Sequence, residues 1–157
     1  MKSIYVILLF ITNSAYAIDG CPSGQKLIAE CTLPGKIERR ALICYTLEKP
    51  ISLTYYFKKN GHVDLEVNFS DKNKLKRWVD DATYTRYFGF HRGSYSYTIG
   101  VPQETPGALA FLDIKKAGAL LSTTDCLSNS FGEKDIAHPY IENIPDIKVR
   151  ENNFKFP

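Results

Sequence analysis

The sequence contains no apolar run long enough to cross a membrane as a helix. Its main apolar stretch, residues 4–11, has eight residues, whereas a spanning helix needs about 20. The stretch follows Lys2 and precedes the small-residue site Ala15-Tyr16-Ala17, an order typical of a secretory signal peptide. We therefore interpret residues 1–17 as a signal peptide and expect a periplasmic or secreted mature chain that begins near Ile18.

The sequence also lacks the motifs of several enzyme classes. It has no Gly-x-Ser-x-Gly elbow, no His-Glu-x-x-His helix and no phosphate-binding glycine loop. Ser23-Gly24-Gln25-Lys26 fits a Ser-x-x-Lys nucleophile pattern, but the serine and lysine content produces about one such match by chance. Asp64 and Glu66 alternate with apolar residues, as on the exposed face of a strand. We assign no catalytic residue and no cofactor.

Neither sign of charge is in large excess. The chain has 20 Lys and Arg residues against 17 Asp and Glu, and the signal peptide removes only Lys2 from this balance. A nucleic-acid binder is expected to carry a strongly basic face. The one local basic cluster, residues 72–77, is followed at once by Asp80 and Asp81. We expect a solvated turn there and no nucleic-acid partner.

Close cysteine pairs of the Cys-x-x-Cys type are absent, and the three histidines do not cluster near a cysteine, which disfavours a metal site. In an exported chain an even number of cysteines indicates disulfides. Two disulfides are therefore expected, and their three possible connectivities stay open. The four cysteines are Cys21, Cys31, Cys44 and Cys126.

A lipid anchor is the alternative at Cys21. Ile18-Asp19-Gly20-Cys21 resembles the box that precedes a lipoprotein cysteine, yet Asp19 departs from the apolar or small residues of that box. An unlipidated Cys21 also keeps the cysteine count even. We favour a mature protein without a lipid anchor.

Short alternating or β-branched segments separated by turn residues run from residue 26 to 123, a pattern typical of an antiparallel sheet. We expect an all-β fold: an antiparallel meander forming a small barrel or sandwich of about eight strands in residues 18–130, stapled by disulfides. Residues 131–157 carry scattered prolines and are expected to form a mostly irregular tail. The expected strands are 26–31, 37–44, 51–57, 62–69, 82–91, 94–99, 108–114 and 118–123.

Three local predictions can be made within this meander. A three-residue loop, Lys59-Asn60-Gly61, would pair Phe57 with Val63 and Tyr55 with Leu65, leaving the opposite face wetter. Ser70 would cap a short helix within residues 70–81 that places Leu75, Trp78 and Val79 on one side. A second hairpin, reversing near Arg92-Gly93, would pair Phe90 with Tyr95 and Phe88 with Tyr97.

Two parts of the chain resemble known families. Cys31, Leu42-Ile43-Cys44, the aromatic segment 53–57 and the alternating segment 63–66 resemble a family of small exported bacterial β-rich proteins without an assigned activity, over residues 31–126. Arg92-Gly93-Ser94-Tyr95 is similar, with changed order and spacing, to the loop that exported inhibitors of C-type lysozyme insert into the enzyme's cleft. That second resemblance implies a small barrel in which Arg92 pairs with an acidic cleft.

The function expected from the sequence is therefore that of an exported, non-enzymatic binding protein. Tyr and Arg are enriched at binding hot spots, so we predict a partner-binding site at Arg92, Ser94, Tyr95 and Tyr97. The partner would be an exported enzyme, for example one that degrades cell walls, held by an inhibitor or an immunity-like protein. A small-ligand carrier with a cavity in the barrel and an exported hydrolase that uses Ser23 or Glu66 are the alternatives.

Overall fold

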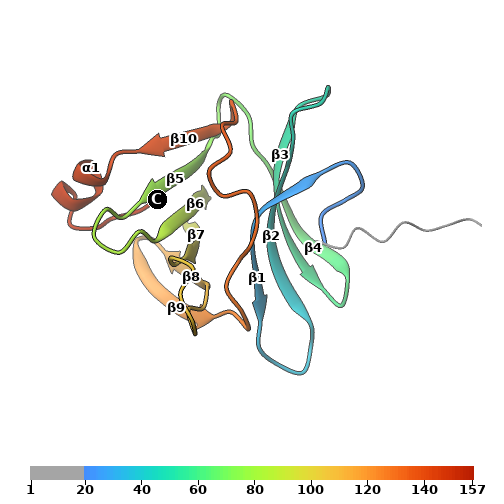
Figure 1. Cartoon of the computed structure of the whole chain (residues 1–157), viewed down its shortest axis with the longest axis horizontal. Helices are drawn as coiled ribbons and strands as arrows, with labels where there is room; N and C mark the ends of the chain where they lie inside the picture. Colours follow the sequence, from blue (N-terminus) through green and yellow to red (C-terminus); the bar gives the residue numbers. More distant parts are fainter. Residues whose placement is uncertain (1–19) are drawn as a thin grey trace, which may run out of the picture.

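The computed structural model describes residues 20–157, so the signal peptide assigned to residues 1–17 and the expected start near Ile18 lie outside the described residues. The described chain contains ten strands and one short helix (Figure 1). The strands are β1 Lys26–Leu33, β2 Arg39–Thr46, β3 Ser52–Lys59, β4 His62–Asn68, β5 Leu75–Val79, β6 Arg86–Arg92, β7 Tyr95–Val101, β8 Phe111–Lys116, β9 Ala119–Asp125 and β10 Ile141–Ile144; the helix is α1 Asp146–Glu151.

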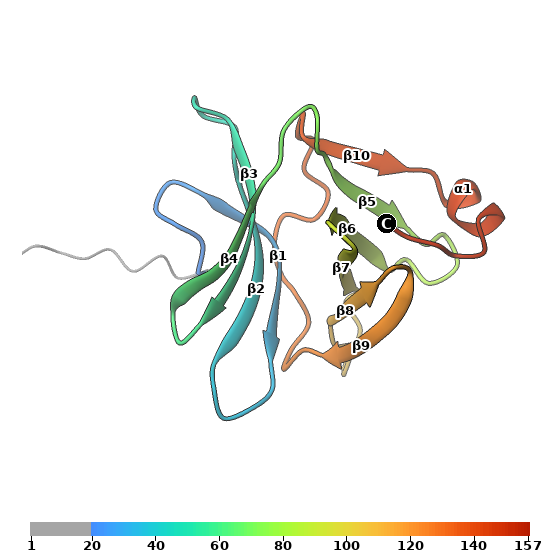
Figure 2. The same cartoon turned by 180° about the vertical axis from the view of Figure 1, so that it is seen from behind.

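The strands form two sheets that pack face to face. One sheet has the order β1-β2-β3-β4 and the other has the order β10-β5-β6-β7-β8-β9. All neighbours are antiparallel except β10, which runs parallel to β5. Figures 1 and 2 show the two sheets side by side, with the chain after β9 running between them. The expected all-β fold is confirmed as a sandwich, with two more strands than expected and no closure of the two described sheets into a barrel.

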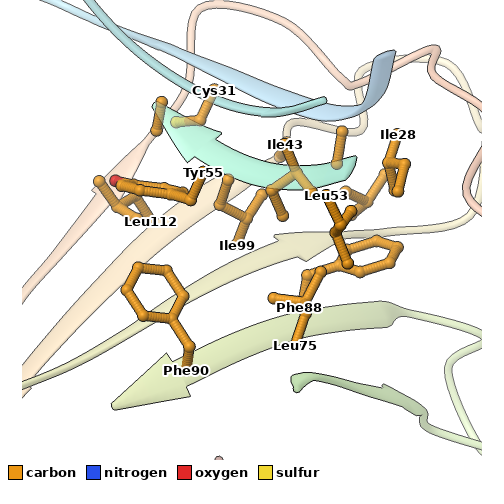
Figure 3. Close-up of a cluster of buried hydrophobic side chains, with 14 of the residues drawn as sticks. Ile28, Cys31, Ile43, Leu53, Tyr55, Leu75, Phe88, Phe90, Ile99 and Leu112 are labelled. Atoms are coloured by element: carbon orange, nitrogen blue, oxygen red, sulfur yellow. The ribbon is translucent and has the colours of Figure 1, made fainter. Parts of the chain in front are cut away.

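The main core lies between the sheets because the strands alternate apolar and polar side chains. Tyr55, Ile43 and Leu53 from the first sheet meet Phe88 and other apolar residues of the second (Figure 3). Tyr55 and Phe88 are each only 1% exposed. Burial, with a further contribution from nearby Tyr97, raises the pKa of the Tyr55 hydroxyl. Side chains therefore fill the space between the sheets.

Both expected disulfides are confirmed, with one of the three connectivities that the sequence left open. Cys31 in β1 is bonded to Cys126 just after β9, so this bridge links the two sheets. Cys21 is bonded to Cys44 in β2. Two disulfides fit a protein that folds in an oxidising compartment.

The β3–β4 hairpin corrects the predicted loop. The turn contains two residues, Asn60 and Gly61, both with positive φ (47° and 77°), as a type I′ turn requires. A bulge at Asp64 then shifts the register, so that Phe57 pairs with Leu65 rather than Val63. The predicted three-residue loop is wrong because the extra residue lies in the strand instead of the turn.

The outer face of this hairpin is also drier than predicted. Thr54 is 1% and Tyr56 is 7% exposed. The N-terminal segment covers part of this face: Cys21 packs in a small cluster with Tyr56 and Cys44, and Lys58 Nζ donates to the carbonyl of Gly20 at 2.7 Å. The N-terminal segment, held by the Cys21–Cys44 disulfide, thus covers part of a face that the sequence pattern predicts to be polar.

The short helix predicted within residues 70–81 is a strand, β5. Leu75 and Trp78 are spaced like neighbours on a helix, but they lie on opposite faces of the sheet. Leu75 faces the main core, whereas Trp78 packs on the outer face with Val149 and Phe156. The apparent helical spacing arises because this strand is covered on both sides.

The tail predicted over residues 131–157 is more ordered than expected. Residues 131–140 are irregular, but β10 then adds to the sheet beside β5, and α1 and residues 152–157 fold over the outer face (Figure 2). The sequence predicts no strand here because four residues are too short for an alternation signal. Phe156 is 5% exposed, so the C-terminal residues belong to the folded unit.

Residues 126–140 bridge the two sheets through hydrogen bonds to β1. Glu133 N donates to the carbonyl of Leu27 at 2.8 Å, and Glu30 N donates to Ser130 Oγ at 2.8 Å. A Cβ atom at Gly132 would collide with the backbone of Ile28. Glycine is therefore required where this segment crosses β1.

A buried histidine anchors the end of this segment. His138 is 7% exposed and lies against the rings of Tyr45 and Tyr140, and Tyr140 N donates to its Nδ1 atom at 3.2 Å. Tyr45 in turn donates to Glu133; burial and this contact raise the pKa of Tyr45 to about 12. Burial lowers the pKa of His138, and the nearby backbone of Thr46 and Ser52 partly opposes this effect.

From the buried, neutral His138 we predict that acid lowers the stability of the protein. Because folding favours the neutral imidazole, the stabilisation by His138 is complete above the pKa of the unfolded residue, about 6.5, and is lost as the pH falls from there toward the lower folded pKa. We expect the free energy of unfolding to fall between pH 7 and pH 5, and to fall less in His138→Phe. Urea unfolding at several pH values measures this, and equal slopes in both proteins would contradict the prediction.

Candidate functional site

Three of the four residues predicted to bind a partner lie at one end of the β6–β7 hairpin. The turn is Gly93-Ser94, and Gly93 has a φ of 60° at the first turn position, where a type II′ turn places glycine. Arg92 pairs with Tyr95 in register, so the predicted pairing of Tyr95 with Phe90 is wrong. Arg92 and Ser94 are exposed and Tyr95 is half-buried.

The fourth residue, Tyr97, lies further along β7 and faces the core. It pairs with Phe90 rather than Phe88, and the two rings stack with centroids 5.2 Å apart. Its ring also lies 6.2 Å from that of Tyr55. Tyr97 is therefore half-buried between the sheets, where its ring packs the β6–β7 hairpin against the core.

The neighbouring β8–β9 turn adds a cation to this hairpin end. Lys116 Nζ lies over the Tyr95 ring, 5.4 Å from its centroid, at a distance where a cation–π attraction operates. Ala117 N donates to the carbonyl of Ser94 at 2.7 Å and fixes the two turns together. We call Arg92, Ser94, Tyr95 and Lys116 the hairpin end.

A basic groove of 520 Å³ opens beside the hairpin end. Its basic side chains come from four strands or helices and from the C-terminal residues, and its apolar lining comes from β10, α1 and Phe156. We call it the lysine groove, defined by Lys76, His91, Lys115, Lys148 and Lys155 with Ile144, Val149 and Phe156.

Sheet register explains how the groove forms. On the outer face of the six-stranded sheet, His91, Ser96 and Lys115 lie side by side on β6, β7 and β8. Lys76 lies next to Gly89 on the same face. A Cβ atom at Gly89 would lie 2.9 Å from the Phe156 ring, so glycine gives the C-terminal residues room to lie on the sheet. These residues then close the groove from above.

The groove collects positive charge without an acidic side chain among the described residues that line it. The lysines form no ion pair with any carboxylate of residues 20–157. Their polar contacts are with main-chain oxygens: Lys115 Nζ donates to the carbonyl of Phe156 at 2.7 Å, and His91 Nε2 lies 2.8 Å from the oxygen of Pro157.

A second cavity, of 700 Å³, differs in this respect. Its cations have carboxylate partners: Arg86 pairs with Asp135 at 2.7 Å and Lys134 with Glu104 at 2.9 Å. The contact with Arg86 lowers the pKa of Asp135, and the hydrogen bond from Lys134 lowers that of Glu104. The charges around this cavity already neutralise one another, which leaves the lysine groove as the stronger candidate for an anion.

An aromatic cluster holds the walls of the groove in place. Trp78 stacks on Tyr87 with centroids 4.3 Å apart and packs against Phe156. Its Nε1 atom donates to Asp146 at 2.8 Å, and the carboxylate also accepts from Arg150. The contact with Arg150, followed by the one with Trp78, lowers the pKa of Asp146. Residues 146–156, which carry two of the groove lysines, are thus fixed to the sheet.

The residues named for a hydrolase do not converge on a site. Ser23 is exposed, and Lys26 pairs with Glu133 at 3.5 Å. Asp64 pairs with Lys59 at 2.7 Å, and Glu66 accepts from Asn68 at 3.0 Å. Among residues 20–157 there is no group of three His, Cys, Asp or Glu side chains placed to hold a metal ion. None of the helices in this range is long and apolar enough to span a membrane.

The sequence correctly predicted a reversal at Arg92-Gly93, but it indicated neither Lys116 beside this turn nor the lysine groove. The groove lysines are separated by up to 79 positions, from 76 to 155, and no local pattern joins them. Only the parallel addition of β10 to β5 brings α1 over the sheet. The sequence matches no known family model and no curated protein, and the structure matches no solved structure.

Proposed function

We propose that this protein is an exported, non-enzymatic binding protein that holds an acidic surface or cleft of a partner enzyme with its hairpin end. The partner would be an exported enzyme such as a cell-wall hydrolase, and the protein would act as its inhibitor or as an immunity-like partner in the periplasm. The observation that carries this proposal is the exposed pair Arg92 and Ser94 beside Lys116. Within residues 20–157, neither Arg92 nor Lys116 forms an ion pair with a carboxylate.

The geometry of the hairpin end suits this task. Arginine can hold a carboxylate through two parallel hydrogen bonds, and Tyr95 contributes a rigid aromatic surface under Lys116. A positive patch speeds the encounter with an acidic partner and selects against basic ones. The type II′ turn and the stacked Tyr97 and Phe90 hold the hairpin in one conformation, which lowers the entropy lost on binding.

Two observations favour this proposal over its alternatives. The space between the sheets is filled by the main core, which favours binding at the surface over a ligand carried in the interior. The side chains named for a hydrolase are exposed or engaged in local ion pairs and hydrogen bonds. Neither observation depends on the identity of the partner.

Arg92→Glu is expected to weaken partner binding strongly. Charge reversal removes the bidentate donor and repels the partner's carboxylates, so we expect at least about a tenfold loss of affinity, equivalent to about 1.4 kcal/mol. The measurement is inhibition of a panel of cell-wall hydrolases, C-type lysozyme among them, by the oxidised chain from residue 18. Each inhibited enzyme is then titrated with both proteins.

Lys36→Glu is the matched control. It makes the same change in net charge at an exposed position in the β1–β2 loop, away from the hairpin end. Inhibition that survives in Lys36→Glu and is lost in Arg92→Glu would support the proposal. If no hydrolase in the panel is inhibited, or if both variants inhibit as the wild type does, the proposal fails.

A further inference from the structure

The lysine groove is a separate feature that the proposed function does not use. It contains four lysines and His91, and folding brings them together from β5, β6, β8, α1 and the C-terminal residues. The positive charges of the four lysines repel one another, and this repulsion is relieved when an anion occupies the space between them. In the second cavity the chain supplies its own acidic side chains. The described lining of the groove has none, and its polar contacts are with the carbonyl of Phe156 and an oxygen of Pro157, the last residue of the sequence.

The lining also limits the kind of anion. Its apolar side consists of half-buried Ile144 and the small exposed parts of Val149 and Phe156, which are otherwise buried against Trp78. A small inorganic ion would leave this side unused. The volume of 520 Å³ lies in the range of small-molecule sites, about 300–1,000 Å³. A ligand that fills the groove therefore has both a charged and an apolar part.

The charge pattern indicates the chemistry of the head group. Lysine binds phosphate as a point charge. A phosphate monoester carries close to two negative charges near pH 7, enough to interact with several ammonium groups at once. Lys76 and Lys115 are half-buried beside the sheet, whereas Lys148 and Lys155 are exposed on the opposite wall, so cations flank the groove from two sides.

We propose that the lysine groove binds a phosphate monoester that carries an apolar chain. The lysines hold the phosphate and the side formed by Ile144, Val149 and Phe156 holds the chain. The same head group and chain occur in a soluble alkyl phosphate and in a lipid such as phosphatidic acid. The site is distinct from the hairpin end, and its occupation does not require a protein partner.

Binding of octyl phosphate to the oxidised chain from residue 18, measured by isothermal titration calorimetry, tests this site. We expect saturable binding with one site per chain, at least about tenfold weaker binding of inorganic phosphate, and no saturable binding of octyl glucoside, which has the same chain and a neutral head group. Equal binding of octyl glucoside would show that the groove is only apolar. Equal binding of inorganic phosphate would show that the apolar side contributes nothing. Either result overturns the proposal.

Lys148→Glu is the decisive variant because its side chain is exposed on α1, so the reversal perturbs packing little. We expect at least a tenfold loss of octyl phosphate affinity in Lys148→Glu, recovery in Lys148→Arg, and no more than a threefold change in Lys36→Glu and Arg92→Glu. An equal loss in Lys36→Glu would show that net charge alone governs binding and would refute the site.

Sedimentation with vesicles distinguishes the two sources of the head group. Binding to phosphatidylcholine vesicles that contain phosphatidic acid, competed by octyl phosphate and weakened by Lys148→Glu, assigns a membrane lipid. Octyl phosphate binding without vesicle binding assigns a free ligand. Because Arg92→Glu alters enzyme inhibition but not octyl phosphate binding, failure of the proposed function and failure of this site give different results.

Discussion

Replacing Cys31 and Cys126 together by alanine is expected to lower the free energy of unfolding by about 4–5 kcal/mol, a large part of the stability of a domain this size. This disulfide joins residues 95 positions apart and links the two sheets. Without it, the unfolded chain gains the entropy of a long open loop. Both cysteines are also buried, at 1% and 2% exposure, so their loss weakens packing. Urea unfolding followed by the fluorescence of Trp78 measures the effect.

The double replacement of Cys21 and Cys44 is the internal comparison. This bridge spans 23 positions and lies within one side of the sandwich, so the same chain-entropy relation gives a smaller loss of about 3 kcal/mol. A larger loss on removal of Cys21–Cys44 than of Cys31–Cys126 would show that the link between the sheets is not the dominant constraint.

Trp78→Ala is expected to destabilise the protein by about 3–5 kcal/mol, the usual cost of deleting a buried tryptophan. The indole is 5% exposed, stacks on Tyr87, contacts Phe156 and donates to Asp146. Its removal opens a cavity under α1 and leaves Asp146 with one donor fewer. The effect should centre on residues 141–157, which we expect to become more accessible in amide hydrogen exchange.

Trp78→Phe is the control because it keeps an aromatic ring against Tyr87 but loses the donor to Asp146. We expect about half of the stability loss and nearly normal exchange over residues 141–157. If Trp78→Ala leaves this exchange unchanged, the aromatic cluster does not hold the C-terminal residues. Octyl phosphate binding should weaken in parallel with undocking, since Lys148 and Lys155 move with this segment.

Which face each residue occupies could be predicted more reliably than which residue it pairs with. The alternation of Tyr55, Phe57, Leu65 and Val67 correctly places them on one face. Their register depends on whether the one extra residue lies in the turn or in a strand, and the bulge at Asp64 has no local signature in the sequence. The same holds for the β6–β7 hairpin, where the aromatic face is predicted correctly but Phe90 pairs with Tyr97 rather than Tyr95.

Burial on both faces explains the remaining errors. Leu75 and Trp78 in β5 have the spacing of apolar residues in a helix because each faces a different apolar cluster, on opposite faces of the sheet. Tyr56 belongs to an outer face that the disulfide-linked N-terminal segment partly covers. In both places a segment that is distant in the sequence covers the second face of the strand. The local sequence of the strand contains no information about that segment. The lysine groove was missed for the same reason.

The order of the four cysteines has a practical consequence for producing the protein. The first pairs with the third and the second with the fourth. A chain that is oxidised in the order of its synthesis exposes Cys21 and Cys31 together before Cys44 follows, and the native partner of Cys31 comes 95 residues later. Any bond formed early between neighbours must be exchanged by thiolate attack before the sandwich can close. The yield of native protein therefore depends on an isomerase or a glutathione buffer, and a strong oxidant alone traps mispaired chains.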